Sequence, residues 1–156
     1  MADLTDRSGE MAAGNRDGRA VDALAQAEQR VRTMRAVRDR DTTPERALRR
    51  LITGLGHRYR LHVRTLPGCP DLVFGSRKKV IFVHGCFWHG HHCRAGLNQP
   101  KSNTEYWTKK LLRNRTRDSG NRARLRALGW KALTVWECQL RRMAIVEERI
   151  SRFLDG

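Results

Sequence analysis

Histidine and cysteine are concentrated in one ten-residue segment, His84–Cys93, which holds four of the six histidines and two of the four cysteines. Thiolate and imidazole are the ligands that zinc prefers, and a structural zinc site holds four of them in a tetrahedron. Cys86 and Cys93 could therefore bind one ion with one intervening histidine, and Cys138 could supply the fourth ligand. Spacing leaves three histidines open as the third ligand: His89, His91 and His92.

The alternative for this segment is a buried thiol pair with histidines on the surface. It is the weaker interpretation, because such a density of ligands is unusual without metal and a long irregular loop in a small domain needs something to hold it. No export signal precedes the four cysteines, so metal ligation or free thiols are expected rather than disulfides. Cys69 stands alone in a turn and is expected to be a free thiol.

A carboxylate and two imidazoles indicate hydrolysis of a phosphodiester bond. Asp71 follows Pro70 at the start of an expected strand, and His84 and His89 follow the next strand. This reaction needs a metal that polarises the phosphate and a base that takes a proton from water. Magnesium binds through one or two carboxylates, and histidine has a pKa suited to proton transfer near neutral pH. Asp71 alone is weak evidence, since an aspartate in a turn commonly hydrogen-bonds to its own backbone.

Three large aromatic side chains accompany these residues. Phe87 and Trp88 fall in a polar, glycine-rich loop with no obvious core to enter, and among so much basic charge they could stack on bases or wedge between them. The alternative is that they pack over the zinc loop. For Trp107, a place on the buried face of its own helix is an equally good interpretation.

Helix and strand patterns surround these candidate site residues. Thr43 is expected to cap a helix that has Pro44 in its first turn and apolar residues at helical spacing up to Leu55. Alternation of apolar and basic residues predicts a half-buried strand over 58–64. The remaining expected elements are strands at 71–74, 80–83 and 130–136, a helix capped by Thr104 that runs towards Leu128 and could break at 119–120, and an amphipathic helix at 140–153.

This order of elements predicts an α/β fold. A meander of three strands followed by a helical crossover gives a mixed sheet with helices on both faces. Residues 1–30 are rich in Ala, Gly, Asp and Arg and are expected to form a flexible leader, which leaves 31–156 as one domain. No apolar run is long enough to span a membrane and no secretory signal is visible, so a cytoplasmic protein is expected.

The chain of 156 residues is strongly basic, because 32 Lys and Arg against 16 Asp and Glu give a net charge of +16. Residues 1–33 are near neutral, so the excess lies in the remainder. A compact body with this charge repels itself unless it works on a polyanion, and nucleic acid is the natural candidate. A ribosomal or general RNA-binding protein fits the charge alone.

Four unusual motifs follow one another along the chain: Leu66-Pro-Gly-Cys-Pro-Asp71, Val80-Ile-Phe-Val-His-Gly-Cys-Phe-Trp-His-Gly-His-His-Cys93, Thr104-Glu-Tyr-Trp107, and the stretch from Gly129-Trp130 to Val135-Trp-Glu-Cys138. In residues and in order they resemble the very short patch repair endonucleases. The resemblance implies a restriction-endonuclease-like three-layer fold. It also implies a DNA mismatch endonuclease that nicks the thymine-bearing strand at a T:G mismatch, the lesion left when 5-methylcytosine deaminates.

The resemblance further implies double-stranded DNA as substrate, a functional link to a DNA cytosine methyltransferase and a location at the bacterial nucleoid. A monomer is expected, because one mismatch offers no two-fold symmetry. Among the catalytic residues, Asp71 and the backbone carbonyl of Val83 would bind Mg²⁺, His89 would act on the attacking water, and His84 would support the phosphate. Two further residues would act on metal-bound water or on the histidines: Glu45 and Asp118.

The same resemblance implies a zinc site and a set of DNA-inserting residues. The zinc ligands would be Cys86, His91, Cys93 and Cys138. The inserting side chains would be Phe87, Trp88 and Trp107, with Met34 approaching from the opposite groove. The Asp/Glu-x-Lys motif of restriction nucleases is absent from the third strand, where a histidine stands in place of the lysine.

Two other functions compete with this interpretation. A zinc-stapled, non-catalytic DNA-binding module would explain the charge, the zinc ligands and the aromatic residues, but it would leave Asp71, His84 and His89 without a role. A related nicking nuclease with a different DNA specificity would use the same catalytic residues on another substrate.

Overall fold

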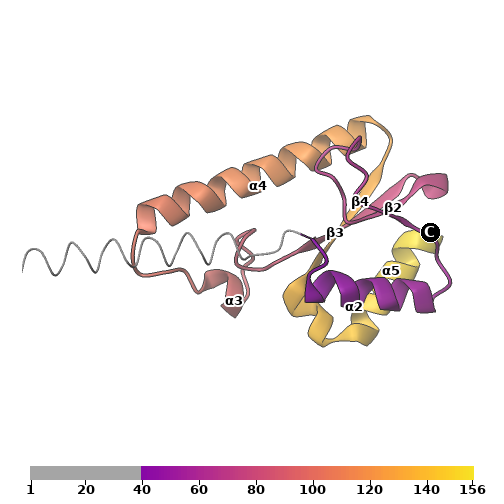
Figure 1. The fold of residues 1–156 in the computed structure, drawn as a ribbon, viewed down its shortest axis with the longest axis horizontal. Helices are drawn as coiled ribbons and strands as arrows, with labels where there is room; N and C mark the ends of the chain where they lie inside the picture. Colours follow the sequence, from indigo (N-terminus) through magenta and orange to yellow (C-terminus); the bar gives the residue numbers. More distant parts are fainter. Residues whose placement is uncertain (1–39) are drawn as a thin grey trace, which may run out of the picture. The chain divides into compact units, whose positions relative to one another are not determined.

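A four-stranded mixed sheet forms the centre of residues 40–156, the part of the chain that the computed structural model describes (Figure 1). In spatial order its strands are β1 (Arg60–Leu61), β2 (Leu72–Phe74), β3 (Lys79–His84) and β4 (Lys131–Trp136). The pairs β1–β2 and β2–β3 are antiparallel, whereas β3 and β4 are parallel. The expected mixed sheet is confirmed. The leader at 1–30 and Met34 lie outside the described residues.

Helices cover both faces of this sheet. α2 (Thr43–Gly54) and α5 (Met143–Asp155) pack on one face, and α4 (Thr104–Ala127) runs along the other (Figure 1). None of the described helices is long and apolar enough to cross a membrane. The core between the sheet and the α2–α5 pair consists of Leu48, Ile52, Leu72, Phe74, Ile81, Val135, Val146, Ile150 and Leu154. The smaller core beneath α4 consists of Val73, Val80, Phe82 and Leu125.

The helix α2 begins one residue earlier than its sequence suggests. Thr42, not Thr43, is the N-cap, and the backbone N–H of Glu45 donates to its hydroxyl oxygen at 3.4 Å. The Thr42 hydroxyl in turn donates to the Glu45 carboxylate at 2.9 Å. The first bond satisfies one backbone donor at the start of the helix, and the second draws the Glu45 side chain back over the first turn, where Glu45 is 3% exposed.

Several expected elements differ in extent from the prediction. The strand expected at 58–64 is reduced to the two residues of β1, since His62 adopts a left-handed backbone with φ 46° that ends the alternation. The loop expected at 85–103 contains a short helix, α3 (Arg94–Leu97), and α4 continues through 119–120 without a break. Asn103, rather than Thr104, occupies the N-cap position of α4. The short helices η1 (Gly75–Arg77) and η2 (Glu137–Arg141) complete the connections.

The parallel pair β3–β4 determines where the candidate site forms. Its register matches His84 with Trp136, the last residue of each strand. The chain therefore leaves both strands at the same edge of the sheet, and two residues later it reaches Cys86 in one case and Cys138 in the other. Cysteines that are 52 residues apart in the sequence are thereby brought together.

Candidate active site and metal cluster

Four ligand side chains converge at this edge of the sheet. The Sγ atoms of Cys86, Cys93 and Cys138 and a ring nitrogen of His91 all lie within 4.8 Å of one another. Zinc–ligand bonds of about 2.0–2.3 Å place the corners of a tetrahedron roughly 3.5 Å apart, so a modest contraction would close this cluster on an ion. The residues present therefore fit a structural zinc site. The cluster selects His91 from the three histidines that spacing left open, and Cys69 lies outside it.

Close backbone packing shapes the cluster. The His91 N–H donates to the Cys86 carbonyl at 2.9 Å. Gly96 of α3 lies so close to this turn that a Cβ atom there would be 2.0 Å from the His91 carbonyl oxygen. From β4, the indole of Trp136 stacks on the His91 ring with centroids 4.3 Å apart. Backbone contacts and one aromatic ring thus hold the ligands in place.

The thiols of the cluster have divergent pKa values. Burial raises the pKa of Cys86 to about 12, whereas hydrogen bonds from His91 and the Gly96 backbone lower the pKa of Cys93 to about 6. Burial also raises the pKa of Cys138. A bound divalent cation favours the thiolate form of its ligands, because it supplies the positive charge that burial otherwise denies them.

A second cluster, the imidazole group, consists of His84, His89 and Asp118. His84 ends β3 and is 7% exposed, and its ring stacks on that of His89 with centroids 3.8 Å apart and an interplanar angle of 9°. Asp118 on α4 approaches Nδ1 of His89 at 2.5 Å. Burial acts to raise the pKa of Asp118, but the hydrogen bond and the charge of His89 outweigh it and hold that pKa below its usual value.

An ionised Asp118 fixes the proton of the His89 ring. A carboxylate only accepts hydrogen bonds, so Nδ1 of His89 carries the proton and the neutral ring presents Nε2 as an acceptor. His84 differs, because burial, followed by the neighbouring charge of His89, lowers its pKa to about 3. His84 is therefore neutral at physiological pH and offers an N–H without a net charge.

A third cluster, the carboxylate group, consists of Asp71, Glu45, His62 and Arg49. Oδ2 of Asp71 accepts from the backbone N–H of Val83 at 2.7 Å, and its Oδ1 lies 3.9 Å from Nδ1 of His62. Burial raises the pKa of Asp71 to about 6, and the nearby Glu45 carboxylate adds to this effect. A largely buried carboxylate with a raised pKa, close to a second carboxylate, suits the binding of a cation.

The Pro-Gly turn before Asp71 is packed against α4. Gly68 has φ 78°, and a Cβ atom there would lie 2.7 Å from Nδ2 of the buried Asn121. The close approach fixes the path of the chain into β2. Asp71 follows this turn, and its carboxylate reaches the backbone of Val83 near the end of β3.

The five catalytic side chains expected from the sequence fall into two groups that meet at the end of β3. His84 and His89 lie together with Asp118, whereas Asp71 lies with Glu45. Val83 joins the groups, because its amide binds Asp71 and the next residue is His84. Within residues 40–156 no hydrogen bond or ion pair joins Asp71 directly to either histidine.

Sequence patterns missed three residues at this site. His62 was placed on the polar side of an expected strand, Trp136 was assigned only to a strand, and Arg49 was given no role. In the structure His62 and Arg49 belong to the carboxylate group. Trp136 contacts both the metal cluster and the imidazole group. Its ring stacks on that of His91 and meets that of His84 edge-on, with centroids 5.3 Å apart.

The aromatic residues expected to insert into DNA form a cluster of their own. Phe87 lies 5.0 Å from Trp88 and 5.3 Å from Trp107 between ring centroids. Trp107 is 8% exposed, but it belongs to neither core of the sheet. Lys110 lies 5.5 Å from the Trp88 ring. The Trp107 side chain thus packs with the loop aromatics rather than beneath its helix.

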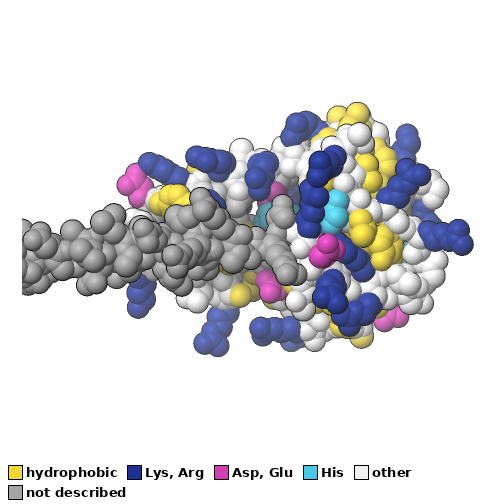
Figure 2. Space-filling model, viewed as in Figure 1, with side chains coloured by type: hydrophobic (Ala, Val, Ile, Leu, Met, Phe, Trp, Pro, Cys, Tyr) yellow, Lys and Arg dark blue, Asp and Glu magenta, His cyan; other side chains and the backbone are white. Residues whose placement is uncertain are grey.

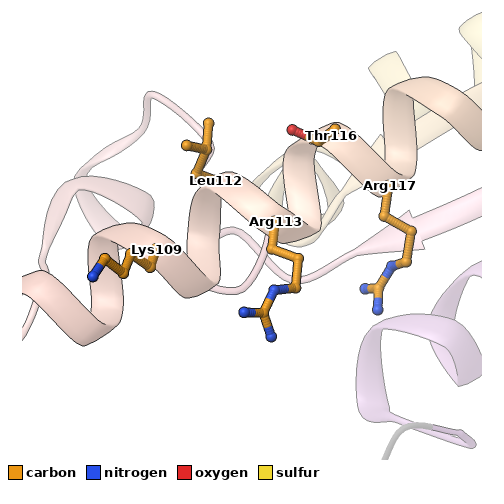
Figure 3. Close-up of a pocket in the computed structure, with 5 residues that line it drawn as sticks. All are labelled: Lys109, Leu112, Arg113, Thr116 and Arg117. Atoms are coloured by element: carbon orange, nitrogen blue, oxygen red, sulfur yellow. The ribbon is translucent and has the colours of Figure 1, made fainter.

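Basic side chains follow α4 from this aromatic cluster towards the imidazole group. Lys109, Arg113 and Arg117 recur every four residues and border a shallow open groove, with Arg113 and Arg117 projecting to the same side (Figure 3). The charge of Arg117 contributes to lowering the pKa of both His84 and Asp118. Lys and Arg side chains also dominate the visible charge of the face in Figure 2, where Asp and Glu are few.

Comparison with known proteins identifies relatives over most of the chain. The family model described as DNA mismatch endonuclease Vsr matches residues 21–95. The chain is 48% identical over 128 residues to the type II nicking enzyme V.XorIIP of Xanthomonas oryzae pv. oryzae, an alignment that covers 82% of this chain and 93% of the relative.

Two further relatives have similar coverage. The DNA mismatch endonuclease Vsr of Escherichia coli is 43% identical over 127 residues, which is 81% of each chain. The type II nicking enzyme V.NmeAIP of Neisseria meningitidis is 40% identical over 121 residues, covering 78% of this chain and 86% of the relative. The chain belongs to the family of the Vsr DNA mismatch endonucleases.

Proposed function

We propose that this protein is a metal-dependent endonuclease that nicks one strand of duplex DNA, built on a restriction-endonuclease-like fold. The observation that carries the proposal is the meeting of two groups at the end of β3, where the Val83 amide holds the Asp71 carboxylate and the next residue opens the imidazole group. A non-catalytic DNA-binding module would have no use for this arrangement of buried titratable side chains.

Each group has a distinct part in the proposed reaction. Asp71 and the Val83 carbonyl would hold Mg²⁺, which when bound polarises the scissile phosphate. His89 accepts the proton of the attacking water at Nε2, while Asp118 orients its ring and stabilises the imidazolium that forms. His84 donates its N–H to the phosphate as negative charge develops. Glu45 supports the carboxylate group through Arg49 and His62.

The surface charge suits a DNA substrate. Lys109, Arg113 and Arg117 lie about 6 Å apart along the helix axis, a spacing that lets successive side chains follow a phosphate backbone. This basic row extends from the aromatic cluster to the imidazole group, so it would hold a strand across the cleavage site. Counterion release would make the binding strongly salt-dependent.

The narrower proposal is a T:G mismatch as substrate. The cluster of Phe87, Trp88 and Trp107 offers aromatic surface beside a basic helix, which suits insertion next to a weakened base pair. The name of the Escherichia coli relative supports mismatch cleavage. A link to a cytosine methyltransferase and a monomeric state follow from this assignment.

A second candidate is a nicking enzyme with another DNA specificity. It is favoured by two of the relatives above, which are described as type II nicking enzymes without mention of a mismatch. Both candidates share the catalytic groups and differ only in the DNA that is opened and held.

Nicking of labelled duplexes tests both levels of the proposal. With Mg²⁺ the protein should nick DNA, and Asp71→Ala should abolish nicking while DNA binding is retained. Asp155→Asn is a matched control, because that carboxylate pairs with His57 and Arg77 on another part of the surface. If the unmodified protein binds DNA but does not nick it, the nuclease proposal is wrong and the protein is a non-catalytic DNA-binding module.

Specificity is tested with a panel of duplexes that differ at one base pair. A T:G pair in varied flanking sequences should be nicked on the thymine strand at least tenfold faster than matched or branched DNA. Equal rates on matched DNA would favour the second candidate, and faster cleavage of branched DNA would exclude the mismatch assignment.

A further inference from the structure

His62 has an unusual backbone and an unusual position. Its φ of 46° lies in the left-handed region, which few residues other than glycine adopt and which recurs at functional sites. Its side chain is 15% exposed and lies between two carboxylates, with Nε2 3.6 Å from Glu45 and Nδ1 3.9 Å from Asp71. A strained backbone that directs a ring between two acidic groups points to a role at the site.

Arg49 determines which ring nitrogen of His62 carries the proton. Nη2 of Arg49 lies 3.1 Å from Nε2 of His62. A guanidinium can only donate hydrogen bonds, so Nε2 must accept and the neutral ring carries its proton on Nδ1. Arg49 is itself held by Glu45 at 2.9 Å and by Asp41. The donor of His62 is therefore directed at Asp71.

We infer that His62 is a positioning residue for Asp71, an inference that rests on the proposed nicking function. The Val83 amide holds Oδ2 of the carboxylate, and the Nδ1–H of His62 is the donor placed to restrain Oδ1. The separation of 3.9 Å is about 1 Å longer than a hydrogen bond, so a small rotation of either side chain closes it. With both oxygens restrained, Asp71 presents one fixed geometry to a cation.

A metal site made by Asp41, Glu45 and His62 themselves is the competing interpretation. Their ligand atoms lie within 4.8 Å of one another. However, the guanidinium of Arg49 already lies among these three side chains, bonded to both carboxylates and to the ring. A cation there would have to displace a positive charge, so Arg49 makes this cluster a support for Asp71 rather than a second metal site.

Four substitutions separate the role of the ring from that of the backbone. In His62→Asn the amide nitrogen occupies the place of Nδ1, and asparagine tolerates a left-handed backbone. In His62→Gln the amide reaches only the place of Nε2, so the contact with Asp71 is lost. His62→Ala removes the ring but keeps the strain, whereas His62→Gly removes both.

The primary readout is Mn²⁺ affinity, measured by titration calorimetry on the full zinc-loaded chain bound to duplex DNA. Ala, Gly and Gln at position 62 should weaken Mn²⁺ binding about tenfold, within the range typical of residues that orient metal ligands. Asn should stay within about threefold of the unmodified protein. In the Ala, Gly and Gln variants, single-turnover nicking should need a correspondingly higher Mg²⁺ concentration. Its rate should recover when Mg²⁺ is saturating.

The outcomes distinguish this inference from the proposed function. If Asp71→Ala removes Mn²⁺ binding but His62→Ala does not change it, the positioning role is wrong and the nuclease stands. Equal weakening by Asn and Ala would also exclude a role for Nδ1. If Asp71→Ala leaves Mn²⁺ binding intact, the proposed metal ligand fails and this inference fails with it.

Discussion

The imidazole group and the carboxylate group use the same side chain in opposite ways. In the imidazole group, a carboxylate from α4 accepts from His89 and leaves Nε2 free as an acceptor. In the carboxylate group, a guanidinium from α2 donates to His62 and leaves Nδ1–H free as a donor. The sign of the partner's charge therefore decides whether each ring acts on a proton or restrains a ligand.

Burial also acts on both groups, but it shifts the pKa of one residue upwards and that of the other downwards. It raises the pKa of Asp71 to about 6 and lowers that of His84 to about 3. Both side chains are thereby shifted towards their neutral forms. His84 contributes stability that is present above its unfolded pKa and is lost as pH falls towards 3, whereas the contribution of Asp71 is lost as pH rises through 6.

The largest expected effect comes from breaking the metal cluster at the edge of the sheet, which Trp136 links to the imidazole group. Cys138→Ser deletes one ligand of the cluster and should release the ion, since three ligands bind zinc far more weakly than four. Structural zinc contributes about 10 kcal/mol of folding free energy in small domains, so the unfolding midpoint should fall by on the order of 10 °C or more. Thermal unfolding with a colorimetric zinc assay measures both. Retention of one zinc per chain by the variant, with an unchanged midpoint, would contradict the assignment.

Removing the free acceptor of the imidazole group comes next. His89→Ala should lower the single-turnover nicking rate about 10³-fold, roughly 4 kcal/mol, with little change in DNA binding. His57→Ala is the matched control, since that ring pairs with Asp155 at the C-terminal end of α5. A loss of less than tenfold would show that another group accepts the proton.

The raised pKa of Asp71 should make the free energy of unfolding depend on pH. The pKa of Asp71 is about 6 in the folded chain, against an ordinary value of 3.8, so folding favours its protonated form. Its contribution to the free energy of unfolding is full below pH 3.8. As pH rises through 6, about 3 kcal/mol of this free energy is lost. Asp71→Asn removes this loss. Without added divalent cation, the free energy of unfolding of the variant minus that of the unmodified protein should increase from pH 4 to 7. A difference that stays flat across this range would refute the buried-carboxylate account.

The smallest effect is expected at the ring between the zinc cluster and the imidazole group. Trp136→Phe keeps a stacking surface for His91 and an edge for His84, so nicking should fall about twofold. Trp136→Ala should lower the nicking rate about tenfold and weaken zinc retention. Trp130→Phe serves as the control, because that ring packs on the core beneath α4. Identical behaviour of the three variants would exclude a positioning role for Trp136.

Local patterns predicted much of this molecule from the sequence. Apolar spacing located α2, β3, β4 and α5, and ligand density located the metal cluster. The choice of His91 as its histidine came only from the family resemblance, because spacing cannot tell which ring the packing of Gly96 and Trp136 directs at the thiols.

The support of Asp71 could not be predicted in this way. His62 depends on a left-handed backbone and on Arg49, 13 residues earlier on a different element. Alternation of residue types carries no information on either, so the pattern around His62 predicted an ordinary half-buried strand. Long-range contacts that depend on one backbone dihedral leave no periodic signal in a sequence.

The central claim is that the two groups serve a single metal-dependent cleavage site at the end of β3. Anomalous scattering from crystals of the full chain with a nicked duplex and Mn²⁺ tests it most directly. The account predicts a manganese peak bonded to the Asp71 carboxylate, with the cleaved phosphate between it and His89. A peak bonded to Glu45 and Asp41 instead, or a phosphate out of reach of His89, would contradict it.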